Sequence, residues 1–215
     1  MAPNLDPLNQ LYSAIRGYLA GKDDPLVQRM ARDLPTSPEP RILPPRTYPV
    51  ADHLAKITRA SDPDATGLRA DLALNRAAFQ WGQSYGEDDF GPDFINNYAY
   101  LEILGTRGHF RSDTVACGLL MIGPNTAYPA HRHTAEEIYV IVSGTAAWMK
   151  AGSDYEKLSP GTVVHHPSQI VHAMRTDTEP LVVIYIWRGG DLAQKSEVSG
   201  LPQAPSISAT QSSSL

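Results

Sequence analysis

The chain has 215 residues, of which 42% are hydrophobic, which is enough for one domain with a sizeable core. Its 18 basic and 23 acidic residues give a net charge of −5, which argues against nucleic acid or an anionic membrane as the main partner. No window approaches 18 consecutive apolar residues, so we expect no membrane-spanning segment. The first ten residues lack a basic segment followed by an apolar stretch, and we therefore expect a cytoplasmic protein.

Residues 1–95 are predicted to form an N-terminal α-helical region. In the stretch LNQLYSAIRGYLAG, apolar residues recur near a 3.6-residue period. Asp24 followed by Pro25 is typical of the start of a second helix. Two further helical patterns follow a proline-rich connector, at residues 53–60 and 67–81. The segment 83–97 is polar and contains glycine, and we expect it to be a loop that can move.

Residues 96–192 have a different pattern, with short β-rich runs separated by Gly, Pro, Asn and Asp. Many short strands at this spacing predict an antiparallel barrel or sandwich, not a βαβ fold. Cys117, the single cysteine, lies in an apolar run and is predicted to be a buried structural thiol. The segment 193–215 is rich in Ser and Pro and is predicted to be a disordered tail. The helical region is expected to cover one end of the barrel or to form a homodimer contact.

A metal site is predicted from the spacing of His131, His133 and Glu137. Side chains alternate between the two faces of a strand. On one uninterrupted strand these three residues and Tyr139 therefore point to the same side. Two imidazoles and one carboxylate suit one divalent transition metal ion: Zn, Fe, Mn, Ni or Co. A fourth ligand is predicted to be His172, because a turn at Gly161, a strand and a second turn would return the chain across the sheet.

These two segments resemble the paired motifs of the cupin family. The first matches in its histidines, its glutamate spacing and its closing Gly144, and the second matches at Gly161, Pro167 and His172. Gln169 and Thr176 stand where the motif has glycine and asparagine. The resemblance implies a mainly β fold, the cupin double-stranded β-helix or jelly-roll-like barrel, joined to the N-terminal helices. His165 and His166 are rival ligand candidates, of which one is expected to line the cavity. His109 is predicted to be a surface residue.

Aromatic residues around the predicted ligands point to a more specific family. Tyr128 precedes the histidines, Tyr139 follows Glu137, and the last strand carries Tyr185 and Trp187, which Tyr98, Tyr100 and Trp148 are expected to join. Together with the helical N-terminal half, this set resembles the bacterial cupin-type dimethylsulfoniopropionate lyases. The resemblance implies cleavage of a small zwitterionic substrate, dimethylsulfoniopropionate, to acrylate and dimethyl sulfide.

The chemistry of that reaction suggests a role for each residue. A divalent metal can bind the substrate carboxylate, and a tyrosinate is a strong enough base to remove the α-proton. Aromatic faces can hold the sulfonium cation. We therefore expect Tyr139 to be the general base, with Tyr128 the alternative base or a substrate anchor, and Trp187 and Tyr185 to form the sulfonium pocket.

Three other functions use the same ligands. An Fe(II)-dependent dioxygenase would keep open positions for oxygen. A sugar or keto-acid isomerase would have a cavity lined by polar groups and arginines, whereas the candidates here are largely aromatic. A non-catalytic metal- or ligand-binding cupin would bind the zwitterion without releasing product.

Overall fold

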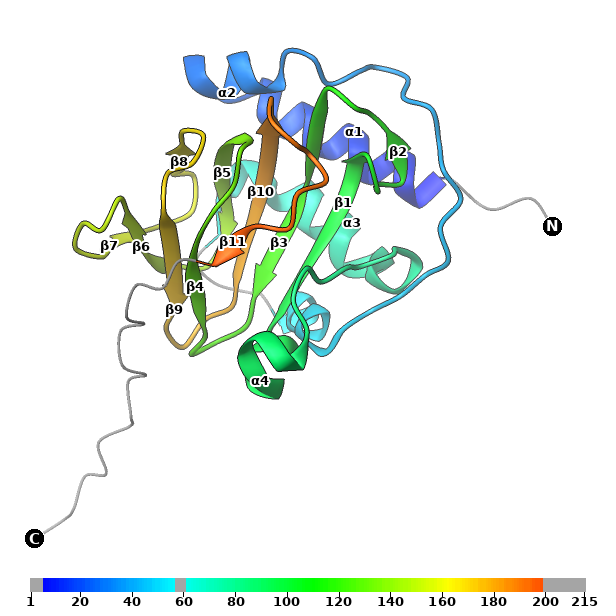
Figure 1. The fold of residues 1–215 in the computed structure, drawn as a ribbon. Helices are drawn as coiled ribbons and strands as arrows, with labels where there is room; N and C mark the ends of the chain where they lie inside the picture. The colour runs from blue at the N-terminus through cyan, green and yellow to red at the C-terminus, as the bar shows by residue number, and fades with distance from the viewer. Residues whose placement is uncertain (1–5, 57–60, 199–215) are drawn as a thin grey trace, which may run out of the picture.

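The computed structural model describes residues 6–56 and 61–198. Within this part of the chain, two β-sheets whose strands are mostly antiparallel face each other, and helices cover the outer face of one of them (Figure 1). The larger sheet has the strand order β2-β1-β3-β10-β5-β8, and the smaller has β11-β4-β9-β6-β7. The strands are β1 Tyr98–Gly105, β2 Phe110–Arg111, β3 Val115–Ile122, β4 Ala127–Arg132, β5 Glu136–Ser143, β6 Ala146–Lys150, β7 Glu156–Leu158, β8 Val163–His166, β9 His172–Thr176, β10 Leu181–Arg188 and β11 Glu197–Val198.

The N-terminal helices begin and end where the sequence signals predict. Helix α1 (Asp6–Ala20) buries its periodic apolar residues, and α2 (Pro25–Ala31) begins at Asp24, whose side chain accepts hydrogen bonds from the backbone N–H groups of Leu26 and Val27. The patterns at 53–60 and 67–81 correspond in part to the helical segments η1 Pro49–Lys56, α3 Thr66–Asn75 and η3 Arg76–Ala78. Residues 57–60 lie outside the described part of the chain.

The larger sheet has an apolar outer face and a mixed inner face. Along β10, Val182, Ile184 and Ile186 belong to the same core cluster as the buried residues of the helices, whereas Val183 and Tyr185 belong to the cluster inside the barrel. Both faces of this strand are covered, which explains why its sequence is an almost continuous apolar run. Cys117 belongs to the outer, helix-covered set, and burial raises the pKa of its thiol to about 12. The prediction of a buried structural cysteine is confirmed.

Two sequence predictions about irregular segments are wrong. Residues 87–96 are not a loop but the helix α4 (Glu87–Asn96), kinked at Gly91, and its Phe94 packs among tyrosines at one end of the barrel. Residues 193–198, assigned to a disordered tail, cross the barrel and end in β11, which pairs with β4. The sequence signal failed in both cases because polar segments with few apolar residues can still be ordered by side-chain hydrogen bonds and strand pairing. Residues 199–215 of the predicted tail lie outside the described residues.

Candidate metal centre

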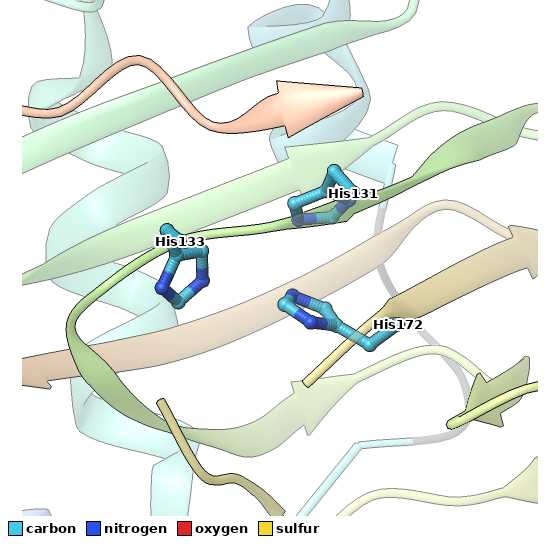
Figure 2. Close-up of side chains that lie close together, drawn as sticks. All are labelled: His131, His133 and His172. Atoms are coloured by element: carbon cyan, nitrogen blue, oxygen red, sulfur yellow. The ribbon is translucent and has the colours of Figure 1, made fainter. Parts of the chain in front are cut away.

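Three imidazoles meet inside the barrel from two segments distant in the sequence. Ligand atoms of His131, His133 and His172 lie within 4.8 Å of one another, and all three side chains are buried (Figure 2). Strand pairing brings them together, because His131 on β4 lies directly opposite His172 on β9. The turn between β8 and β9 forms although Gln169 replaces glycine: Gln169 adopts a positive φ of 65°, and its backbone N–H donates to the His133 carbonyl over 2.8 Å.

Glu137 completes the cluster from the other sheet. The expected single strand is interrupted, since β4 ends at Arg132 and β5 begins at Glu136, which leaves His133 in the turn between them. The assumption of one continuous strand is therefore wrong, although all four predicted ligands still converge. Glu137 Oε2 lies 3.1 Å from His133 Nε2 and 3.4 Å from His172 Nε2.

The tautomers of the three histidines fit metal binding. In each ring Nδ1 lies 2.7–3.0 Å from a backbone carbonyl two residues away: Pro129 for His131, Ala135 for His133 and Ile170 for His172. A carbonyl only accepts hydrogen bonds, so Nδ1 carries the proton in each neutral ring and Nε2 presents its lone pair. The buried Nε2 of His172 has no hydrogen-bond donor among the described residues. Lone pairs that converge on a carboxylate suit a bound cation, and ligands about 2.1 Å from such an ion would lie roughly 3–3.4 Å apart.

The electrostatics of the cluster favour the same conclusion. Burial alone would raise the pKa of Glu137, but the charge of His133 and hydrogen bonds from the histidines hold it well below its usual value. Burial opposes charging of His133, yet Glu137 more than offsets this effect and raises the pKa of His133. The centre therefore stabilises a carboxylate together with a neighbouring positive charge.

A fifth residue, His166, also contacts the cluster. Its Nδ1 lies 3.4 Å from Glu137 Oε2, and its ring stacks on that of His172 with 3.8 Å between centroids. Burial, followed by the charge of His172, lowers the pKa of His166 to about 4. His165 points the other way and bonds Glu136. Of this adjacent pair, His166 therefore faces the cluster and His165 does not, and neither is among the residues that line the cavity.

Tyr139 lies beside Glu137, and both residues line the cavity. Burial, then the charge of Glu137, raises the pKa of Tyr139 well above 10. Tyr128 packs on His131 with 4.6 Å between ring centroids, and its ring also contacts those of Tyr98 and Tyr85 at 5.3 Å and 6.2 Å. Tyr85 lies in the segment that was predicted to be a loop. No pattern in the sequence identified it as a residue near the site.

The predicted pocket aromatics lie around the same cavity, which contains about 530 Å³ of space free of protein atoms, its open mouth included. Trp187 stacks on His133 at 4.1 Å and donates from Nε1 to Glu137 Oε1 over 2.5 Å. Tyr185 faces Gly118, where a β-carbon would come within 2.9 Å of the tyrosine hydroxyl. Trp148 is not a wall residue but packs behind Tyr139. The residues lining the cavity are Ser84, Tyr98, Tyr100, Glu102, Arg107, Ala116, Leu120, Tyr128, His131, Glu137, Tyr139, Tyr185, Trp187, Leu192, Gln194 and Ser196.

Two features of this lining were not predicted from the sequence. Glu102 and Arg107 form an ion pair at the wall, with 3.6 Å between Oε2 and Nε, so the cavity is not purely aromatic. The segment from Leu192 to Ser196 supplies a further wall.

His109, predicted at the surface, is buried outside the cavity. No helix in the described residues is long and apolar enough to cross a membrane.

The fold and the histidine–glutamate cluster define a cupin with a site able to hold a metal ion. The family model for dimethylsulfoniopropionate lyase matches residues 23–183. The lyase DddQ of Ruegeria pomeroyi is 34% identical over 161 residues, which cover 73% of this chain and 78% of that protein. The chain therefore belongs to the dimethylsulfoniopropionate lyase family.

Other relatives agree with this assignment. The putative lyase DddL of Cereibacter sphaeroides is 30% identical over 69% of this chain and 62% of its own length. The crystal structure of Ruegeria pomeroyi DddQ superposes with a TM-score of 0.82 at 28% identity, covering 90% of this chain and 96% of that one. A structure described with the lyases RdDddP and RnDddQII gives 0.83 at 29% identity, covering 90% and 98%.

Proposed function

We propose that this chain is a carbon–sulfur lyase that cleaves dimethylsulfoniopropionate to acrylate and dimethyl sulfide by β-elimination. The observation that carries the proposal is the buried group of His131, His133 and His172, which Glu137 contacts at two of its members. This group lies beside Tyr139, in a cavity walled by tyrosines and a tryptophan. Family membership supports the same reaction, since the relatives are named for it.

His131, His133, Glu137 and His172 would hold one divalent ion, of which zinc, iron, manganese, nickel and cobalt all suit the donor set. When bound, this ion supplies a Lewis acid for the substrate carboxylate and a positive charge that lowers the pKa of a nearby phenol. The protein supplies the remaining parts of the reaction.

Tyr139 is the general base in this proposal. Its oxygen takes the α-proton of the substrate, the electron pair of that C–H bond forms the new C=C bond, and the β-carbon–sulfur bond breaks with its electrons on sulfur. Dimethyl sulfide leaves as a neutral molecule, and acrylate keeps the carboxylate. Because burial and Glu137 raise the pKa of the free phenol, Tyr139 depends on the added cation to act as a base near neutral pH.

The aromatic walls bind the cationic end of the substrate. Trp187 and Tyr185 line the cavity and present ring surface to a sulfonium, at about 0.5–2 kcal/mol per contact. Tyr128 lies on the opposite sheet among the rings of Tyr85 and Tyr98, which suits an anchor better than a base. The alternative, that Tyr128 is the base, is tested by comparing Tyr139→Phe with Tyr128→Phe.

A sealed-vial assay tests the function. Protein reconstituted with each candidate metal is mixed with dimethylsulfoniopropionate under strict anaerobiosis, and dimethyl sulfide in the headspace is measured together with acrylate in solution. We expect the two products in equal amounts, and we expect their formation to stop when a chelator removes the metal. Binding without product would favour a non-catalytic cupin, and a requirement for oxygen would favour a dioxygenase.

A further inference from the structure

His166 occupies a place in the centre that the four-ligand set leaves unexplained. On β8 it lies directly opposite Glu137 of β5, while Trp187 of β10 lies opposite Glu137 on its other side. Cross-strand neighbours share a face of the sheet, so both side chains reach the same carboxylate. Trp187 Nε1 meets Oε1, and His166 Nδ1 meets Oε2.

His166 differs from the other three imidazoles in its partners. Their Nδ1 atoms bond backbone carbonyls and their Nε2 atoms face the centre. His166 instead turns Nδ1 towards Glu137, and its buried Nε2 has no hydrogen-bond partner in the described part of the chain. An ionised carboxylate only accepts hydrogen bonds, so this contact is favourable when Nδ1 carries the proton.

The surroundings of Nε2 support the same tautomer. Trp148 lies next to His166, with 6.3 Å between ring centroids, and its buried indole N–H also has no partner among the described residues. An Nε2 lone pair leaves the indole N–H as the one unpaired donor of these two rings. If His166 were a metal ligand through Nδ1, its Nε2 would carry the proton and would be a second buried donor with no partner among the described residues, which is unfavourable.

We propose that His166 is a positioning residue for the metal centre and not a fifth ligand. Its Nδ1–H holds Oε2 of Glu137 while the Trp187 indole holds Oε1, so donors from the two flanking strands fix the carboxylate in the plane that faces the histidines. The inference rests on the proposed metal site. Hydrogen-bond partners of this kind typically change metal affinity by about 10–100-fold.

The proposal is tested with two substitutions of His166, one that removes the hydrogen-bond donor and one that removes the ring. His166→Phe keeps a ring to stack on His172 but removes the N–H, whereas His166→Asn loses the ring but places an amide N–H where imidazole Nδ1 lies. We expect His166→Phe to weaken zinc and cobalt binding by about 10–100-fold. His166→Asn should remain within about threefold of the parent protein if the donor is what matters. Metal affinity is measured by competition with a chromophoric chelator.

The visible spectrum of the cobalt-loaded protein provides a second readout. A positioning role predicts that the band pattern survives in His166→Phe, because the ligand number is unchanged. A pattern characteristic of a lower coordination number would identify His166 as a ligand and overturn the proposal. Equal losses of affinity in the Phe and Asn variants, or no loss in either, would also overturn it.

Controls keep these outcomes distinct from misfolding and from failure of the proposed function. His165→Gln changes the neighbouring imidazole, which bonds Glu136 away from the centre, and should bind metal like the parent. If circular dichroism shows that His166→Phe does not fold, His166→Gln replaces it, since its amide lies at the position of Nε2 and not of Nδ1. Failure of the parent protein to bind any metal would refute the metal site itself, before the role of His166 is tested.

Discussion

Tyr139 illustrates how position alone can give a common side chain a chemical role. The residue is buried, lies next to the predicted ligand Glu137 and is part of the cavity wall. We expect Tyr139→Phe to lower dimethyl sulfide release by at least about 100-fold, the usual minimum for loss of a general base. Headspace measurement with the metal content determined in parallel checks this. Tyr128→Phe is the matched comparison, and the larger loss in that variant would transfer the base role to Tyr128.

Trp187 has two functions in the structure that one substitution can separate. Its ring lines the cavity, and its indole N–H binds Glu137. Trp187→Phe keeps an aromatic face but removes the donor, so we expect metal affinity to fall by roughly 10-fold, because a group orienting a ligand is lost. Metal titration measures this effect. Unchanged metal affinity with a higher KM would instead assign Trp187 to the substrate alone.

The individual ligands could be predicted from sequence because their spacing within two short segments is itself the signal. His131, His133 and Glu137 are neighbours in the chain, and the motif around His172 brings its own turns. The contacts of His166 and Trp187 with Glu137 could not be predicted in this way. They depend on the registers of β8 and β10 against β5, and register is set by the packing of whole strands.

At the scale of elements, the segment that follows β10 is the clearest departure from expectation. Its composition predicted disorder, yet Gln194 accepts hydrogen bonds from both the backbone N–H and the hydroxyl of Thr134 over 2.8 Å. Lys195 pairs with Asp89 of α4, and Glu197 pairs with Arg132. The segment thus joins the two sheets and α4 across the cavity. Its local sequence does not show that Thr134, Asp89 and Arg132 are its partners, because all three are distant in the chain.

Loosening this segment should affect substrate binding more than folding. We expect Gln194→Ala to raise KM several-fold, because two hydrogen bonds of about 1 kcal/mol each hold a cavity wall in place. Lys195→Ala is the matched control, since its ion pair with Asp89 is exposed and contributes little. Steady-state kinetics on both variants measures the difference. Equal KM values would show that the segment does not shape the site.

For the molecule as a whole, the helical region and the barrel share one core. His109 forms hydrogen bonds with segments of both regions. Its backbone carbonyl accepts from Arg41 of the long connector, its backbone N–H donates to Glu102 of β1, and its Nε2 accepts from the N–H of Gln80. The strand pattern and the paired histidine motifs predicted the fold class, but they carried no information on which connector would cover His109.

This buried histidine makes stability depend on pH. Burial lowers the pKa of His109 from 6.5 to about 4, so the unfolded chain binds this proton more readily than the folded one. The stability that the neutral, buried His109 contributes is fully present above pH 6.5 and is lost as the pH falls from 6.5 towards 4. Linkage gives a loss of about 2 kcal/mol between pH 8 and pH 5. Protonation would also break the acceptor role of Nε2 towards Gln80.

His109→Gln should reduce this dependence, because the glutamine oxygen can accept the same hydrogen bond without titrating. Urea unfolding of the metal-free parent and variant at pH 8 and pH 5 measures it, with the metal-site histidines contributing equally to both proteins. We expect the parent to lose about 2 kcal/mol more than the variant over this interval. The same loss in both would mean that His109 is protonated in the folded protein without penalty, and that the acid sensitivity arises at the metal centre, whose imidazoles are also buried.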